Sequence, residues 1–137
     1  MNVPLKYIPK HLSKKDKKIQ KKQLMISRKK YEKGLYISRL SVKTFKSKKS
    51  KHILNAEKIY KIKNLKINKN LSKKTGCSIK SLNKIVKKGQ GAYYSSGSRP
   101  NQTAHSWGIA RLASSITSGK AAAIDYNILL KGCNKNS

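Results

Sequence analysis

A serine-based catalytic set is the first chemistry that the residue types of this chain could support. Such a set would combine Ser95 or Ser98 with His105 and Asp125, the hydroxyl, imidazole and carboxylate of acyl-transfer enzymes. No nucleophile-elbow motif surrounds either serine, and only four acids occur in 137 residues, so carboxylates for acid–base catalysis are scarce. We predict no catalytic residues and a protein that is not an enzyme.

Metal binding is the second chemistry to consider. Cys77, Cys133 and His105 are three candidate ligands, but their spacing matches no zinc motif. Two cysteines are too few for a disulfide framework, so we expect free thiols in a reducing compartment, with a single bridge as the alternative. We predict no metal and no cofactor.

Phosphate binding is the third chemistry, and the charge of the chain favours it. The formal net charge is +30; residues 1–88 carry 29 of the 34 lysines and arginines with three acids, whereas residues 89–137 carry five with one acid. This excess calls for a polyanionic partner. Lysine outnumbers arginine heavily, which favours diffuse phosphate neutralisation over reading of base edges. Nucleic acid is the expected partner, and an anionic membrane surface or an acidic protein surface is the alternative.

Membrane insertion is not expected. No run approaches the roughly 18 apolar residues of a membrane span, and residues 1–10 lack the apolar core of a signal peptide.

Residues 1–52 are expected to form a basic, partly disordered arm that orders when anions neutralise it. Within it, Ser13 is a helix N-cap with Asp16 three residues on, and Gly34 ends the helix. The apolar residues of this helix form no continuous stripe, which predicts no burial face. It is either a basic helix laid along phosphates or a solvated helix. Residues 35–46 are expected to form a short strand or an extended arm.

Residues 71–89 resemble the core of a helix-turn-helix. Gly76 can take the left-handed turn conformation, and Ser78 is the expected N-cap of a second helix that ends at Gly89. The inward positions of that helix are Leu82, Ile85 and Val86, and the outward ones are Lys80, Ser81, Lys84, Lys87 and Lys88. Docking on DNA and a purely structural hairpin both fit this pattern.

Residues 89–103 are expected to be a loop, because glycine, serine and proline are frequent there. The loop could present N–H groups, hydroxyls and a guanidinium to a phosphate. Alternatively, its glycines simply allow the chain to turn. The candidate phosphate-binding residues are Gly91, Ser95, Ser96, Gly97, Ser98 and Arg99.

Two helices are expected after this loop. Thr103 should cap a central helix over residues 104–117, whose apolar stripe is Ile109, Leu112, Ala113 and Ile116. Its Arg111 either binds phosphate or pairs with Asp125. The last helix, over residues 120–130, is expected to bury Ile124, Ile128 and Leu129 and to be closed by Gly132.

These patterns together predict a mainly α protein. A small helical domain with a helix-turn-helix-like hairpin is expected over residues 53–133, after the basic arm of residues 1–52 and before a disordered tail at 134–137. The candidate nucleic-acid-binding residues are Lys73, Lys74, Lys80, Ser81, Lys84, Lys87, Lys88, Arg99 and Arg111.

Several segments together resemble a known family. They are KKTG at residues 73–76, GQGAYYSSGSRPNQT at 89–103, HSWGIARLASSITSGKA at 105–121 and Asp125, with a leader at residues 7–23. This combination is similar to an uncharacterised domain shared by basic proteins of large nucleocytoplasmic DNA viruses, with distant relatives in tailed phages. The resemblance implies a viral source and association with the virion or its genome, and it brings no established activity.

Two functions fit these observations. The first is a virion protein, made in the viral factory of the host cytoplasm, that binds and condenses the genome, expected to be double-stranded DNA, through its phosphates. The second is a minor capsid protein whose basic arm binds acidic surfaces of capsid proteins. The first is preferred because of the lysine density and the helix-turn-helix-like segment; the oligomeric state is not predicted.

Overall fold

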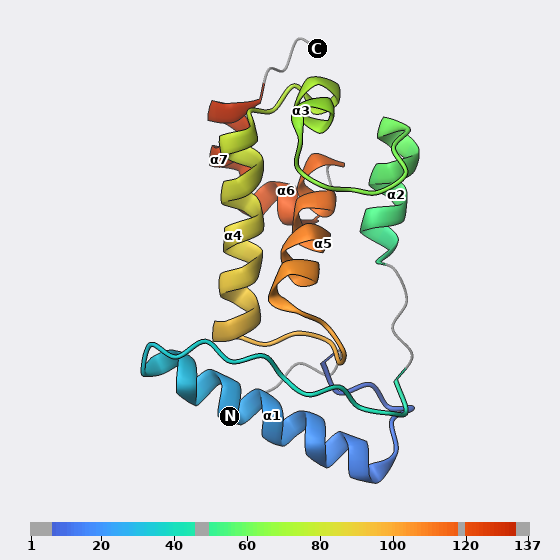
Figure 1. Ribbon diagram of the computed structural model, residues 1–137, viewed down its shortest axis with the longest axis vertical. Helices are drawn as coiled ribbons and strands as arrows, with labels where there is room; N and C mark the ends of the chain where they lie inside the picture. The colour runs from blue at the N-terminus through green and yellow to red at the C-terminus, as the bar shows by residue number, and fades with distance from the viewer. Residues whose placement is uncertain (1–6, 46–49, 118–119, 134–137) are drawn as a thin grey trace. The chain divides into compact units, whose positions relative to one another are not determined.

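The computed structural model of the chain describes residues 7–45, 50–117 and 120–133, and within these ranges the protein is mainly helical (Figure 1). The mainly α fold class is therefore confirmed. The tail at 134–137 lies outside the described residues. The helices are α1 (Lys14–Glu32), α2 (Lys51–Tyr60), α3 (Lys69–Thr75), α4 (Ile79–Ser95), α5 (Ala104–Ile116), α6 (Lys120–Ile124) and α7 (Tyr126–Gly132).

The chain divides into two compact units. The first comprises residues 1–48 and 90–107, and the second comprises residues 49–89 and 108–137. This division differs from the expected boundary near residue 52, because the end of α4 and the start of α5 belong with the N-terminal residues. Each unit has its own buried side chains.

Helix α1 lies in the first unit and begins and ends as predicted. The Ser13 hydroxyl accepts a hydrogen bond from the Asp16 N–H at 3.1 Å, and Gly34 follows the helix with φ +80°. The helix does have a burial face, so that prediction was wrong. This face is largely polar, which is why a search for an apolar stripe misses it. Its residues are Asp16, Gln20, Leu24 and Ser27.

Residues 35–45 run back along α1 (Figure 1). The Leu40 N–H donates to the Gln23 side chain at 3.4 Å, and the Thr44 N–H donates to the Asp16 carboxylate at 2.8 Å. Residues 35–42 form neither helix nor strand, so the short strand is not formed; residue 46 of the predicted segment lies outside the described residues. Residues 7–45 thus have defined internal contacts, which the expectation of a disordered basic arm did not include.

The helix-turn-helix-like hairpin is present in the second unit. Gly76 takes the left-handed conformation with φ +74° at the end of α3. The Ser78 hydroxyl then accepts a hydrogen bond from the Ser81 N–H at 3.2 Å in the first turn of α4. The predicted inward residues Leu82, Ile85 and Val86 are buried, as is the α5 stripe of Ile109, Leu112, Ala113 and Ile116.

Helix α4 continues through Gly89 to Ser95, so its predicted end at Gly89 was wrong. Helices α4 and α5 run side by side (Figure 1), and a Cβ at Gly89 would lie 2.6 Å from the Gly108 Cα atom. Gly89 therefore permits close contact between two helices and does not cap one. The expected loop at 89–103 shortens accordingly to residues 96–103.

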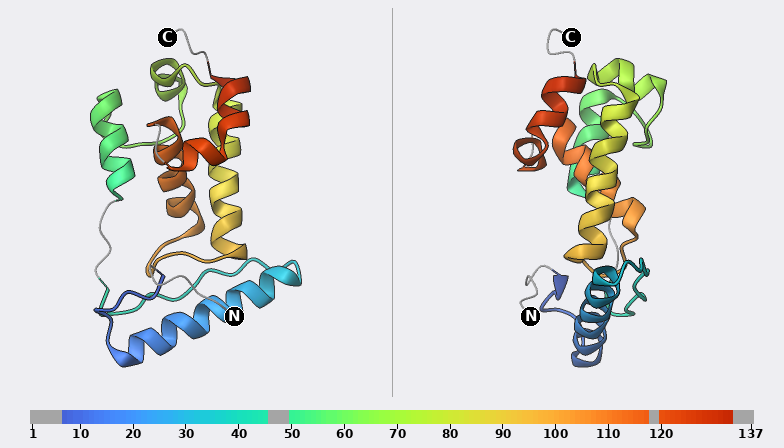
Figure 2. Two further views of the ribbon diagram at one scale, coloured as in Figure 1. Left: turned by 180° about the vertical axis from the view of Figure 1, so that it is seen from behind. Right: turned by 90° about the vertical axis from the view of Figure 1, so that its left-hand side faces the viewer.

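The predicted last helix is broken into α6 and α7 at Asp125 (Figure 2). Ile124 is 67% exposed and not buried as expected. Gly132 is the last residue of α7, and a Cβ there would overlap the Ser81 hydroxyl of α4. Directly after it, Cys133 forms a disulfide with Cys77. The expectation of free thiols was therefore wrong, and the single bridge is correct.

Candidate nucleic-acid interface

Three of the predicted lysines form an exposed row on α4. Lys80, Lys84 and Lys87 are spaced four and three residues apart, which places them on one face of the helix. All three side chains are exposed, whereas Leu82 and Ile85, on the opposite face, are fully buried in the core of the second unit. We call Lys80, Lys84 and Lys87 the α4 lysine face. Lys73, on α3 in the same unit, is exposed as well.

Two other predicted residues of the hairpin have structural partners. Ser81 is only 9% exposed and accepts a hydrogen bond from the Ser78 hydroxyl at 3.0 Å, so its predicted outward position was wrong. The Lys74 ammonium donates to the carbonyl oxygens of Tyr60 and Lys61 at 3.0 and 3.2 Å. Lys74 thus satisfies carbonyl groups at the C-terminal end of α2, where a cation is favoured.

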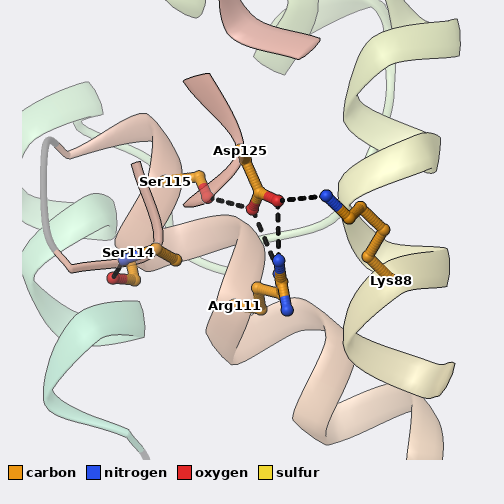
Figure 3. A network of polar contacts seen from close by, with 6 residues as sticks. Lys88, Arg111, Ser114, Ser115 and Asp125 are labelled. Carbon is orange, nitrogen blue, oxygen red and sulfur yellow. Dashed lines mark hydrogen bonds and ion pairs between the residues drawn. The ribbon is translucent and has the colours of Figure 1, made fainter. Parts of the chain in front are cut away.

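Arg111 and Lys88 converge on Asp125, which is only 1% exposed (Figure 3). The Arg111 Nε and Nη2 atoms lie 3.1 and 2.7 Å from the two carboxylate oxygens. Lys88 Nζ lies 3.3 Å from Oδ1, and the Ser115 hydroxyl donates to Oδ2 at 2.7 Å. The pairing of Arg111 with Asp125 is therefore the correct alternative, and this guanidinium is occupied inside the second unit.

The electrostatics of this cluster keep Asp125 ionised. Burial alone would raise the pKa of the carboxyl group, but the hydrogen bonds from Arg111, Ser115 and Lys88 and the charge of Arg111 outweigh it and hold the pKa below its usual range. The Lys88 side chain is 47% exposed, so its predicted outward position is correct. The Asp125 carboxylate nevertheless compensates part of its charge.

The residues predicted to form a phosphate-binding loop are not presented together. Gly91 and Ser95 belong to α4. Ser98 is 1% exposed, and its hydroxyl accepts from Arg39 Nη2 at 2.8 Å and donates to the Arg99 carbonyl at 2.9 Å. Gly97 is buried, with φ +121°. Internal packing uses most of this segment, and the exposed members of the set are Ser95, Ser96 and Arg99.

Arg39 is a central residue of the first unit that the sequence patterns did not single out. Its guanidinium lies 3.7 Å from the centre of the Tyr93 ring, and Nη1 donates to the Ser27 hydroxyl and to the Tyr93 carbonyl at 2.9 and 2.8 Å. These partners are neutral. Burial lowers the pKa of Arg39, while the nearby Tyr93 and Tyr7 hydroxyls act in the opposite direction. Tyr93 is fully buried and forms the centre of this cluster.

A family model matches residues 4–131, almost the whole chain. The chain belongs to the family of unknown function DUF5824. No curated protein and no solved structure matches it. The DUF5824 match includes the α4 lysine face and Asp125, so both lie within the domain that defines the family.

Several residues of the catalytic and metal sets considered from the sequence have structural partners in the described parts of this DUF5824 chain. His105 is exposed, while Ser98 and Asp125 are buried with the partners given above. Within residues 7–45, 50–117 and 120–133, no three histidine, cysteine or acidic side chains gather as metal ligands. The helices in these ranges are all too short or too polar to span a bilayer.

Proposed function

We propose that this protein is a non-enzymatic, virion-associated protein of a large DNA virus, which binds nucleic acid through the phosphate backbone and helps to package or condense the genome. The resemblance to basic proteins of large nucleocytoplasmic DNA viruses supports the viral source. The α4 lysine face carries the binding part of the proposal. Double-stranded DNA is the expected ligand.

Few acids of the chain are available to neutralise the surface lysines, because most of them bind groups inside the protein. Asp16 accepts hydrogen bonds from Thr44, Glu57 accepts one from the Leu65 N–H at 2.9 Å, and Asp125 binds Arg111. Three of the four acids therefore contribute to internal structure, and few carboxylates remain to neutralise 34 basic residues. This distribution supports attraction of a polyanion.

Lysine on a helix face favours contacts with phosphates over contacts with base edges. Its ammonium is a compact point charge on a flexible stem, without the planar fork with which arginine recognises guanine. Each phosphate that it neutralises releases condensed counterions, so binding should weaken steeply as salt rises. We expect little sequence preference.

The test replaces the α4 lysine face by the triple variant Lys80→Gln, Lys84→Gln and Lys87→Gln. Binding of a fluorescent 20-base-pair duplex is measured by anisotropy over a series of KCl concentrations. The slope of log K against log[KCl] should become shallower by about 2 to 3, because each lost phosphate contact contributes about 0.9. Affinity at low salt should fall correspondingly.

The matched control removes three exposed lysines from another part of the same unit, Lys58→Gln, Lys63→Gln and Lys66→Gln. It should reduce the slope less than the α4 variant does. Equal losses in both variants would show diffuse binding and contradict the assignment to α4. Two results would contradict the proposal and favour a capsid role. One is failure of the wild type to bind duplex DNA at low salt. The other is retention of the protein on the shell of purified particles after genome release.

A further inference from the structure

Three tyrosine rings form an exposed cluster in the first unit. Tyr31 lies in α1, Tyr36 follows that helix, and Tyr94 lies near the end of α4. The ring centres of Tyr31 and Tyr36 are 5.7 Å apart, and those of Tyr36 and Tyr94 are 5.1 Å apart. Tyr36 is 67% exposed, whereas the other two are half-buried. We call Tyr31, Tyr36 and Tyr94 the tyrosine platform.

A helix-ending motif brings Tyr36 back to Tyr31. The Gly34 N–H donates to the Tyr31 carbonyl and the Leu35 N–H to the Lys30 carbonyl, both at 2.9 Å, the pair of bonds that defines a Schellman motif. Gly34 supplies the left-handed conformation that this motif requires, with φ +80°. The chain therefore reverses directly after α1 and places the Tyr36 ring beside Tyr31.

Arg39 then fixes the reversed segment to the end of α4. Its backbone N–H donates to the Tyr93 hydroxyl at 3.0 Å, and its guanidinium covers the Tyr93 ring. The Tyr93 ring in turn meets Tyr94 edge-on, with centres 5.1 Å apart. The tyrosine platform thus packs against Tyr93, which is fully buried. This contact orients the platform rings in the absence of a ligand.

The last turn of α1, which carries Tyr31, is basic. Lys29, Lys30 and Lys33 are exposed next to Tyr31 in sequence, and Glu32 is the one acid of that stretch. Single-stranded nucleic acid combines flat aromatic bases with a chain of negative charges, and proteins bind it with stacking aromatics beside lysines and arginines. The bases of a duplex are already stacked inside the helix and cannot lie on the rings. An acidic peptide would match the lysines but not the exposed aromatic faces.

We propose that the tyrosine platform stacks unpaired bases, so that the protein also binds single-stranded nucleic acid. This inference deepens the proposed function and rests on it, because it assumes that the chain binds nucleic acid. Tyr36 supplies the exposed stacking face, and the lysines of the last turn of α1 contact the phosphates on either side of the stacked base.

The test compares Tyr36→Ala with Tyr36→Phe in the full chain. The ligands are a labelled 20-nucleotide oligothymidylate and the 20-base-pair duplex. Loss of the ring should weaken oligothymidylate binding about tenfold and duplex binding less than twofold. The phenylalanine variant keeps the stacking face and should bind both ligands within twofold of the wild type. Because the Tyr36 side chain is mostly exposed, the alanine variant should retain the wild-type circular dichroism spectrum.

A second measurement uses the wild-type protein and needs no variant. Nitration of Tyr36 by tetranitromethane, mapped by mass spectrometry, should be suppressed by oligothymidylate and not by the duplex. The inference is overturned if Tyr36 stays reactive in the presence of oligothymidylate, if Tyr36→Ala weakens both ligands equally, or if a polyglutamate peptide displaces oligothymidylate at equal charge. In each of these cases duplex binding through the α4 lysine face can still hold. Absence of any nucleic-acid binding would instead contradict the proposed function itself.

Discussion

Asp125 is the only acid in residues 89–137, and its carboxylate is fully enclosed by hydrogen-bond donors. Arg111 contacts both oxygens, and Ser115 donates to one of them. Burying an ion pair is costly in itself, but removing one partner is costlier, because the other charge is left buried without compensation. The Arg111 side chain is 19% exposed, so water can replace the carboxylate only in part.

Asp125→Asn should therefore lower the free energy of unfolding by about 3 kcal/mol at pH 7. The hydrogen bonds to Asp125 and its cationic neighbours place the folded pKa below the unfolded value of 3.8. The stabilisation is thus present above pH 3.8 and is lost as the pH falls through the folded pKa. Urea denaturation of both proteins from pH 7 to pH 2 should show the difference between them shrinking in acid.

Ser115→Ala is the control for this prediction. It removes one hydrogen bond to Asp125 and leaves the Arg111 ion pair intact, so the loss should be about 1 kcal/mol. Equal stability of the wild type and Asp125→Asn at pH 7 would mean that solvent already screens the pair.

The roles of single residues could be predicted only where their partners are local. Ser13 and Thr103 can be predicted as caps from residue type and position, because the N–H from which each hydroxyl accepts lies only three residues away. For Arg111 the sequence leaves two alternatives open, since its partner lies 14 residues on. Arg39 was missed altogether, because its contacts with Tyr93 span 54 residues and follow no periodic pattern.

At the level of the helices, glycine has two uses that the sequence does not separate. Glycine can end a helix in the left-handed conformation, as Gly34 does, or allow two helices to touch, as Gly89 does. The sequence predicts that Gly89 ends α4, whereas in the structure it allows α4 and α5 to touch. The exposed positions of α4 were better predicted, because the period of the helix alone fixes the face opposite to Leu82 and Ile85. Only Ser81 failed, since Gly132 of α7 packs against it.

Gly89→Ala and Gly91→Ala should have opposite effects although both lie in α4. A Cβ at Gly89 would be 2.6 Å from the Gly108 Cα atom, so the helices must separate, and we expect the free energy of unfolding to fall by about 2 kcal/mol. A Cβ at Gly91 meets nothing within 4 Å, so the gain in helix propensity should raise it by about 1 kcal/mol. Chemical denaturation measures both variants. A stabilising Gly89→Ala would contradict the close contact between α4 and α5.

Across the whole molecule, periodicity predicted the mainly helical fold that the structure has, whereas the polyanionic partner expected from composition stays a prediction. The division into two units was not predicted, because α4 and α5 each contribute residues to both, and the periodicity of a continuous helix does not show where one unit ends and the other begins. For a similar reason, the sequence offers the single disulfide only as an alternative to free thiols. Cys77 and Cys133 are 56 residues apart, and only the return of α7 to the first turn of α4 brings them together.

The disulfide makes stability depend on redox conditions. Its closed loop of 56 residues restricts the unfolded chain, and a loop of this length should stabilise the folded state by about 4 kcal/mol. Dithiothreitol should therefore lower the denaturation midpoint of the wild type. The double variant Cys77→Ala and Cys133→Ala should have a similarly low midpoint, and dithiothreitol should not lower it further. An identical midpoint for the wild type with and without dithiothreitol would show that the bridge does not contribute. Reduction of the disulfide should weaken the second unit, which carries the α4 lysine face. Duplex binding by the reduced protein should therefore fall as the temperature approaches the melting temperature of that reduced form.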